Sequence, residues 1–461
     1  GLKVRPFKPQ NMSNNAAVTD DGGEIGRAQA LQALAAKCPL SVHMNPILLK
    51  PQSDEGSQII VQGRVYGHAA ARDYQKLKQT LLTAVLESYE HIREKADLVL
   101  VEGAGSPAEI NLREGDIANM GFARATNTPV VLIGDVDRGG VIASLVGTHS
   151  ILSPEDRHMI AGFIINKFRG DVSLFDDGLT EIVNRTRWQS FGICPWFEHA
   201  HALPAEDSVG LERPQTTTSG SIKIAIPVIS RIANFDDFDP LIAEPDVELV
   251  MVKPGTALPG DAALIILPGS KSTIGDMEFL RKQGWDIDIH AHVRRGNHVL
   301  GICGGYQMLG NQIFDPEQIE GARTQANGLG LLDIETTLER QKTLRNITAT
   351  SVAFGTAITG YEIHMGQTKG PDTTSPMLTI NKKPDGATSP NGLVSGCYMH
   401  GLFTSDNFRR SFLNALGASL ENSPDYNKSI DDTLDTLSNH LETHLDVDAL
   451  FAISPDYGSV T

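Results

Sequence analysis

The stretch from His298 to Gly310 constrains the fold of this chain more than any other. It reads His-Val-Leu-Gly-Ile-Cys-Gly-Gly-Tyr-Gln-Met-Leu-Gly, an apolar run that ends at Cys303 and is followed by two glycines. A strand that turns sharply into a helix holds a nucleophile at the tip of a crowded bend, where small neighbours are needed. The pattern therefore predicts a nucleophile elbow. A lone cysteine is more often a buried core residue, so the prediction depends on catalytic partners elsewhere.

Two further stretches supply such partners. Residues 263–270 (Ala-Leu-Ile-Ile-Leu-Pro-Gly-Ser) form an apolar strand and a turn whose amides, near Gly269, can face a developing oxyanion together with the amide of Gly304. Residues 393–401 (Leu-Val-Ser-Gly-Cys-Tyr-Met-His-Gly) place His400 at the end of another strand. We therefore predict Cys303 as the nucleophile and His400 as the general base.

These motifs resemble the class I (triad) glutamine amidotransferases, and within them the cobyric acid synthase family. The likeness rests on Gly-Ile-Cys-Gly-Gly-Tyr-Gln (301–307), Leu-Pro-Gly-Ser-Lys (267–271), Gly-Tyr-Glu-Ile-His-Met-Gly (360–366) and Tyr-Met-His-Gly-Leu-Phe (398–403). Most class I domains place a Glu two residues after the base, where this chain has Leu402. The resemblance implies a Cys-His pair without that Glu and leaves open what orients His400.

The N-terminal half predicts a second α/β domain. Apolar strands at 97–102, 129–137 and 160–166 are separated by helical patterns, which is typical of a parallel doubly wound sheet. Ligands of such sheets bind beyond the carboxyl ends of the strands. Polar residues gather at those predicted ends, and they are Lys8, Glu102, Asp135, Asp137 and Asn166. We expect a phosphate and metal site there, with Glu102 and Asp135 suited to Mg²⁺ and Lys8 to phosphate, although any one of them could be a surface residue.

The same half is similar to the amide-forming synthetase part of the cobyric acid synthase family. The matching stretches are 6–13 (Pro-Phe-Lys-Pro-Gln-Asn-Met-Ser), 21–29 (which begins at Asp21), 43–51, 101–109, 134–140 and 166–171. The resemblance implies ATP and Mg²⁺ as cofactors, no tightly bound prosthetic group, and glutamine and a corrinoid as substrates. The implied reaction amidates the b, d, e and g carboxylates of adenosylcobyrinic acid a,c-diamide to give adenosylcobyric acid.

One departure concerns the nucleotide. Members of this family open with a strand and a Gly-rich phosphate loop, and no G-x-x-x-x-G-K-[ST] stretch occurs here. We expect an N-terminally incomplete copy; the alternative is a chain without ATP chemistry. In P-loop folds that strand is central, so its loss would leave two strand edges unpaired.

Other functions stay open at this stage. The related cobyrinic acid a,c-diamide synthase has the same two-domain plan but a different loop at 8–13. A ParA-like switch protein would need neither Cys303 nor His400, and a non-catalytic relic would keep both without activity.

Length and composition set the remaining expectations. The chain has 461 residues, and we predict a synthetase domain at 1–212, a linker at 213–221, an amidotransferase domain at 222–418 and a helical tail at 419–461. A net charge of −17 argues against a nucleic-acid surface. No apolar run is long enough for a membrane span. Four cysteines lie far apart without C-x-x-C spacing, so we expect a reducing cytoplasm.

Overall fold

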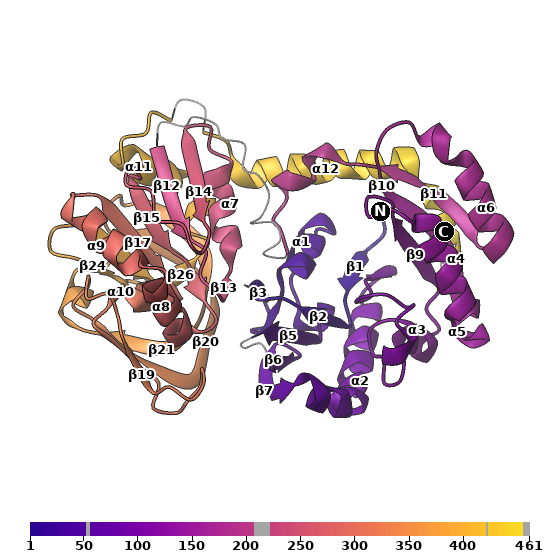
Figure 1. Cartoon of the computed structure of the whole chain (residues 1–461), viewed down its shortest axis with the longest axis horizontal. Coiled ribbons are helices and arrows are strands. Elements are labelled where there is room, and N and C mark those ends of the chain that lie inside the picture. The colour runs from indigo at the N-terminus through magenta and orange to yellow at the C-terminus, as the bar shows by residue number, and fades with distance from the viewer. Residues whose placement is uncertain (52–55, 207–221, 421–422, 455–461) are drawn as a thin grey trace.

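The chain forms two α/β halves with a long helix running between them (Figure 1). This computed structural model describes residues 1–51, 56–206, 222–420 and 423–454. The predicted linker at 213–221 lies outside the described residues. Figure 1 shows the N-terminal half, from indigo to magenta, on the right and the C-terminal half, from pink to orange, on the left.

Parallel strands and helices build the N-terminal half, as the sequence predicts. The strands are β1 (Val4–Phe7), β8 (Leu98–Val101), β9 (Val130–Asp135), β10 (Ile160–Phe168) and β11 (Gln189–Pro195). The helices are α1 (Arg27–Ala35), α2 (Ala71–Arg93), α3 (Met120–Thr126), α4 (Val141–Ile151), α5 (Pro154–His158) and α6 (Asp176–Thr186). Phe7, Tyr89 and Phe122 pack ring against ring beneath β1, while Phe163 and Ile165 on β10 fill a second core.

The parallel strands of this half are not one continuous sheet. β1 pairs with β8, and β9, β10 and β11 form another sheet; within the described ranges no ladder joins the two groups. Leu100 on β8 and Ile133 on β9 are each 57% exposed, although both lie inside apolar strands. The sheet is therefore interrupted between β8 and β9.

A small β-structure between the halves was not predicted. The stretch 8–13 contains β2 (Gln10–Met12), because its backbone pairs in parallel with β5 (Ile47–Pro51). β6 (Gly56–Val61) and β7 (Arg64–Ala70) continue this sheet in antiparallel order. β3 (Ala16–Val18) and β4 (Glu24–Gly26) form a separate hairpin. Buried side chains of β3 pack with Tyr361 and Ile363 of the C-terminal half, so this region is a contact surface between the halves.

The C-terminal half is built on a six-stranded sheet in the order β14-β12-β15-β17-β25-β24. Its first five strands are parallel, and they are β12 (Ile222–Pro227), β14 (Val247–Val252), β15 (Leu264–Leu267), β17 (His298–Ile302) and β25 (Val394–Cys397), with β24 (Ala387–Thr388) antiparallel at the edge. Its helices are α7 (Asp239–Ile242), α8 (Thr273–Lys282), α9 (Trp285–Arg294), α10 (Gly304–Leu309) and α11 (Asp406–Ala415). The apolar runs predicted as strands are strands.

A long antiparallel hairpin covers one side of this half and was also not predicted. It consists of β20 (Glu335–Ser351) and β21 (Ala357–Lys369), and short strands extend it. These are β18 (Gln312–Phe314), β19 (Gln325–Asn327), β22 (Leu378–Ile380), β23 (Lys383–Asp385) and β26 (Met399–His400). β13 (Ile232–Ala233) pairs with β16 (Gly269–Ser270). Because β21 pairs with β26, the hairpin brings its residues next to His400.

The C-terminal segment is helical and returns to the N-terminal half. α12 (Tyr426–His444) runs along the top of Figure 1 in yellow, and α13 (Val447–Ala452) follows it. Leu445 forms a β-bridge with Gly192 on β11, and the imidazole of His440 bonds the carbonyl of Pro195. The segment therefore fastens the two halves together. No helix of the described ranges combines the length and the apolar character that crossing a bilayer requires.

Candidate active site

Cys303 lies at the tip of a strained turn between β17 and α10. Its backbone has φ +53° and ψ −108°, and its amide donates to the carbonyl of Cys397 at 2.9 Å. A left-handed φ is uncommon for a residue with a side chain and is typical of functional sites. The side chain is 7% exposed, and its thiol donates to the carbonyl of Ile363 at 3.5 Å. This is the geometry of a nucleophile elbow.

The glycines around the elbow allow close approach of a neighbouring turn. A Cβ on Gly304 would lie 2.8 Å from the amide nitrogen of Ser270, and a Cβ on Gly269 would lie 3.1 Å from the imidazole Cε1 of His400. The turn at Gly269 and Ser270 therefore lies beside Gly304, which directly follows Cys303.

His400 lies on β26 and is held by a carboxylate from a distant part of the chain. Its Nδ1 lies 2.7 Å from Oδ2 of Asp237, and the other oxygen of Asp237 accepts from the amide of Gly401 at 2.6 Å. His400 and Asp237 are 1% and 2% exposed. A carboxylate that accepts from one ring nitrogen fixes the orientation of the imidazole and leaves the other nitrogen for proton transfer.

The charges around His400 favour its protonated form. Burial alone would lower the pKa of this imidazole, but the carboxylate of Asp237 and the sulfur of Cys303, to which His400 is also hydrogen-bonded, raise the pKa to about 10. Cys303, His400 and Asp237 therefore form one electrostatic unit.

The motif at 360–366 forms the wall of the site on β21. Tyr361 stacks on the ring of His400 with centroids 5.3 Å apart, and the carbonyl of Ile363 faces Cys303. Gln307 on α10 donates to the carbonyl of Met365 at 3.1 Å. The hairpin that the sequence did not predict is thus what closes the pocket over the elbow.

Asp237 belongs to a loop that contacts the N-terminal half. Its neighbour Asp236 pairs with Arg27 of α1, with Nη2 and Oδ2 2.6 Å apart, and the Arg27 guanidinium also lies over the ring of Tyr361. The side chain of Asn234 accepts from the amide of Ala16 at 3.1 Å. Asn234 occupies the N-cap position of the 3-10 turn Phe235–Phe238, but its side chain bonds β3 instead of capping that turn.

The predicted residues of the N-terminal half form two groups. Lys8 pairs with Glu102 at 2.6 Å, and the second oxygen of Glu102 accepts from Gln32 at 2.7 Å. At the ends of β9 and β10, Asp135 pairs with Lys167 at 2.8 Å, and Asp137 pairs with Arg169 at 2.7 Å.

Two predicted residues of this half make mostly local contacts. Asn166 bonds the amide of Lys167 at 2.8 Å. Asp21 lies apart from the strand ends and accepts from Ser41 at 2.7 Å, so its visible role is to hold a turn.

The carboxylates proposed for a metal already accept hydrogen bonds from protein groups. Each oxygen of Glu102 and of Asp135 has a protein donor, and within the described ranges no group of three His, Cys, Asp or Glu side chains is arranged to hold a metal ion. This geometry alone therefore offers no preformed protein cage for Mg²⁺.

Comparison with known proteins assigns a family to both halves. Residues 223–408 match the CobB/CobQ-like glutamine amidotransferase domain, and residues 1–209 match the CobQ/CobB/MinD/ParA nucleotide binding domain. The cobyric acid synthase of Allorhizobium ampelinum is 63% identical over 97% of this chain and 92% of the relative. That of Brucella anthropi is 61% identical over 98% of this chain and 93% of the relative. This chain belongs to the cobyric acid synthase family.

Family membership confirms the predicted fold class and enzyme class. The chain is a glutamine-dependent amidotransferase of the cobyric acid synthase family, with an N-terminal nucleotide-binding domain and a C-terminal amidotransferase domain. The carbon–nitrogen ligase activity predicted for it is the activity of this family.

The carboxylate that orients His400, that of Asp237, was not predicted from the sequence. Leu402 occupies the position where a class I domain usually has a Glu, and its side chain is fully buried in the core. Asp237 instead bonds His400 from a loop 163 residues upstream. The signal that could have found it is the run Asn-Phe-Asp-Asp-Phe-Asp-Pro at 234–240, where acidic residues alternate with buried aromatics.

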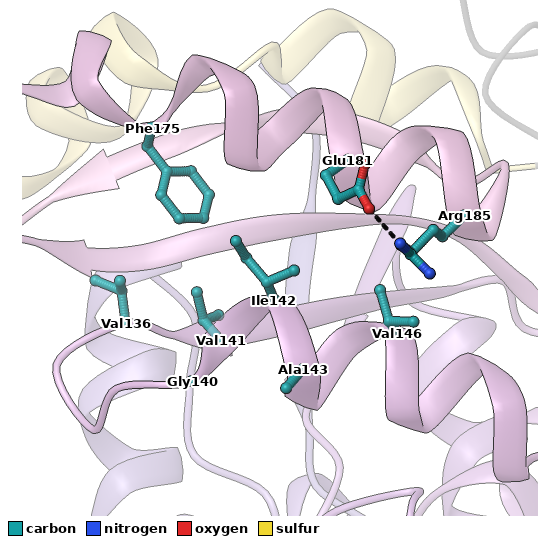
Figure 2. Close-up of a pocket in the computed structure, with 9 residues that line it drawn as sticks. All are labelled: Val136, Gly140, Val141, Ile142, Ala143, Val146, Phe175, Glu181 and Arg185. Carbon is teal, nitrogen blue, oxygen red and sulfur yellow. Dashed lines mark hydrogen bonds and ion pairs between the residues drawn. The ribbon is translucent and has the colours of Figure 1, made fainter.

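The N-terminal half of this family member also has a larger hollow, shown in Figure 2. It lies between α4 and α6 and encloses about 580 Å³. Its walls are mostly apolar, with Ile142 and Phe175 facing the space and the Glu181–Arg185 ion pair, 2.5 Å long, at one end. These walls have few groups for binding a nucleotide phosphate.

Proposed function

We propose that this chain converts adenosylcobyrinic acid a,c-diamide to adenosylcobyric acid by amidating its b, d, e and g carboxylates with ATP and glutamine. The support is its identity of 60% or more with cobyric acid synthases over almost the full chain. The single observation that carries the ammonia-producing half is the hydrogen-bonded arrangement of Cys303, His400 and Asp237 beside the Ser270 turn.

In the glutaminase half, the proton of the Cys303 thiol passes to His400 as the sulfur attacks the side-chain amide carbon of glutamine. The carbonyl oxygen becomes an oxyanion, which accepts hydrogen bonds from the amides of Gly304 and the turn at Gly269 and Ser270. His400 gives its proton to the leaving nitrogen, so the C–N bond breaks and ammonia departs. Water then hydrolyses the thioester, with His400 taking a proton from it, and glutamate leaves. Asp237 holds the imidazole in orientation throughout.

The synthetase half activates a carboxylate of the corrinoid. ATP transfers a phosphoryl group to the carboxylate oxygen, and ammonia displaces phosphate from the acyl phosphate to form the amide. We propose that Lys8, Asp137 and Asn166 would bind phosphate or substrate and that Asp21 holds the turn at Ser41 and Val42. Glu102 and Asp135 are the carboxylates that would hold Mg²⁺ brought by the nucleotide, and the ion would help to neutralise the phosphate charge. The four free cysteines agree with the reducing cytoplasm that we propose as its compartment.

The experiment that tests this function traces the amide nitrogen of glutamine into the corrinoid product. The protein is incubated with ATP, Mg²⁺, adenosylcobyrinic acid a,c-diamide and glutamine labelled with ¹⁵N in the side-chain amide. The expected product is the corrinoid carrying four new ¹⁵N amides by mass spectrometry. Release of labelled ammonia with an unchanged corrinoid would contradict the synthetase half and leave the glutaminase half standing.

A further inference from the structure

Three lysines from both halves close one side of the Cys303 pocket. Lys50 comes from β5, Lys342 from β20, and Lys271 from the turn between β16 and α8, and all three line the same pocket as Cys303 and His400. Lys50 is 1% exposed and the Lys342 side chain 11%. Lysine is almost never buried without a partner, so this concentration of ammonium groups needs an account.

One carboxylate serves two of these lysines. Glu24 on β4 is fully buried, and one of its oxygens bonds Lys50 while the other bonds Lys342. Both oxygens of Glu24 are therefore occupied. Lys271 reaches the neutral amide oxygen of Gln58 at 3.5 Å, the limit of a hydrogen bond, and in the part of the chain that the structure describes it forms no ion pair.

The positive charge of Lys271 is thus incompletely balanced. Burial and the neighbouring ammonium groups of Lys50 and Lys342 lower the pKa of Lys271 well below its usual value, despite attraction from Glu24 and Cys303. Among the described residues, Lys50, Lys271 and Lys342 are close to only one shared carboxylate, that of Glu24. A negatively charged ligand group beside Lys271 would therefore be stabilised.

The carboxyl group of Glu320, which can bind a positive charge, lines the same pocket. Glu320 lies in the loop between β18 and β19, and its carboxyl accepts from the amide of Ile274 at 3.0 Å and from the amide and hydroxyl of Thr273 at the start of α8. Burial raises the pKa of this carboxyl to about 7. Glu320 and Lys271 form no ion pair with each other within the described ranges, so each can bind a separate charge of a ligand.

Free glutamine carries both charges on its α-carbon. When its amide carbon meets the Cys303 sulfur, its α-carboxylate lies about 5 Å further along the chain, from four bonds of roughly 1.5 Å each. We propose that Lys271 binds the α-carboxylate of glutamine and that Glu320 binds its α-ammonium group. This inference rests on the proposed glutaminase role of Cys303 and His400, and it names the subsite that selects a free amino acid over an amide inside a peptide.

The test compares glutamine with two analogues that each lack one charge. Glutaminamide replaces the α-carboxylate by a neutral amide, and glutaramate lacks the α-amino group. Binding is measured by calorimetry in a Cys303→Ala background, so that turnover plays no part. Each ligand is titrated into that protein and into versions that also carry Lys271→Gln, Lys271→Arg, Glu320→Gln or, as a control, the exposed Lys282→Gln.

The expected pattern is selective. Lys271→Gln weakens the binding of glutamine about 10- to 100-fold, the range for a hydrogen bond to a charged group. The same substitution changes the affinity for glutaminamide by less than about 3-fold. Glu320→Gln has the corresponding effect on glutamine and spares glutaramate. Lys271→Arg keeps most of the preference for glutamine, and Lys282→Gln leaves all three ligands unchanged.

Several results would overturn the proposal. Equal affinity of the Cys303→Ala protein for glutamine and glutaminamide would do so without any lysine variant, and so would a preference that persists in Lys271→Gln. A variant that weakens all ligands alike would show a structural role only. Failure of the proposed glutaminase function is seen separately, as a wild-type protein that binds glutamine with this selectivity and releases no ammonia.

Discussion

His400 and Asp237 are in direct contact, with Nδ1 and Oδ2 2.7 Å apart, although 163 residues separate them in the chain. Asp237 also accepts from the amide of Gly401, so the same carboxylate fixes both the ring and the backbone that carries it. The chain therefore has a carboxylate for its base, supplied from a different loop than in most class I domains.

We predict that Asp237→Asn impairs glutamine hydrolysis. The amide can leave His400 in the wrong tautomer, and the same change costs about 10⁴-fold in kcat in proteases with a related arrangement. Steady-state ammonia release measures the loss. The exposed Asp432→Asn is the matched control and keeps the wild-type rate; an Asp237→Asn protein with wild-type kcat would contradict the role assigned here.

The protonation of His400 is expected to depend on both of its partners. In the wild type its pKa is raised to about 10, so the imidazole stays protonated across neutral pH and loses its proton only as the pH rises through that value. Asp237→Asn and Cys303→Ala each remove one negative partner and lower the pKa. Titration of ¹⁵N-labelled histidine by NMR checks this, and a wild-type transition near the free value of about 6.5 would argue against the coupling.

Gly304→Ala is expected to reduce catalysis by disturbing the oxyanion turn. A Cβ at this position would come within 2.8 Å of the Ser270 amide nitrogen, so the turn must shift. Loss of one oxyanion donor costs about 10²- to 10³-fold in kcat. The control is Gly147→Ala on α4, where a Cβ meets nothing within 4 Å and the activity stays unchanged. Equal activities of Gly304→Ala and Gly147→Ala would contradict a role for Gly304 in catalysis.

Arg27 of the N-terminal half contacts residues that adjoin His400 and Asp237. It pairs with Asp236, next to Asp237, and lies over Tyr361, which stacks on His400. We expect Arg27→Gln to lower kcat about 10- to 100-fold, since a hydrogen bond between charged groups is worth roughly 1.5 to 3 kcal/mol, while Arg27→Lys retains more activity. Ammonia release is again the assay. The exposed Arg93→Gln serves as the control, and a loss of equal size in both would point to a general effect on folding.

A stability prediction concerns the buried pair Arg409–Glu244. Both side chains are fully buried, 2.5 Å apart, and Arg409 also donates to the carbonyls of Phe403 and Pro424. Arg409→Met leaves Glu244 without its ionic partner and is expected to lower the free energy of unfolding by about 3 to 5 kcal/mol in urea denaturation. Arg340→Met, at an exposed pair with Glu317, changes it by less than about 1 kcal/mol. If Arg409→Met lowers the free energy of unfolding no more than Arg340→Met does, the Arg409–Glu244 pair is not needed for stability.

The sequence was sufficient for the elements whose patterns are local. The elbow at Cys303 and the strand before it follow from an apolar run that ends at glycines, and both halves were recognisable as α/β. The strand that precedes Gly269 follows from its apolar run in the same way.

Contacts between residues far apart in the chain could not be predicted from local sequence patterns. The β20–β21 hairpin alternates little between apolar and polar residues, and its register depends on contacts with β18, β22 and β26. Nothing local in the sequence shows that the carboxylate of Asp237 meets His400. The Lys50, Lys271 and Lys342 cluster likewise forms only when the two halves meet.

The central claim is that a Cys303–His400–Asp237 unit releases ammonia from glutamine. The most direct test is the rate of glutamate formation from glutamine by wild type and by Cys303→Ala, with the folded state of both checked by circular dichroism. The expected result is measurable hydrolysis by the wild type and a rate for Cys303→Ala that cannot be distinguished from buffer. A Cys303→Ala protein that hydrolyses glutamine as fast as the wild type would contradict the account.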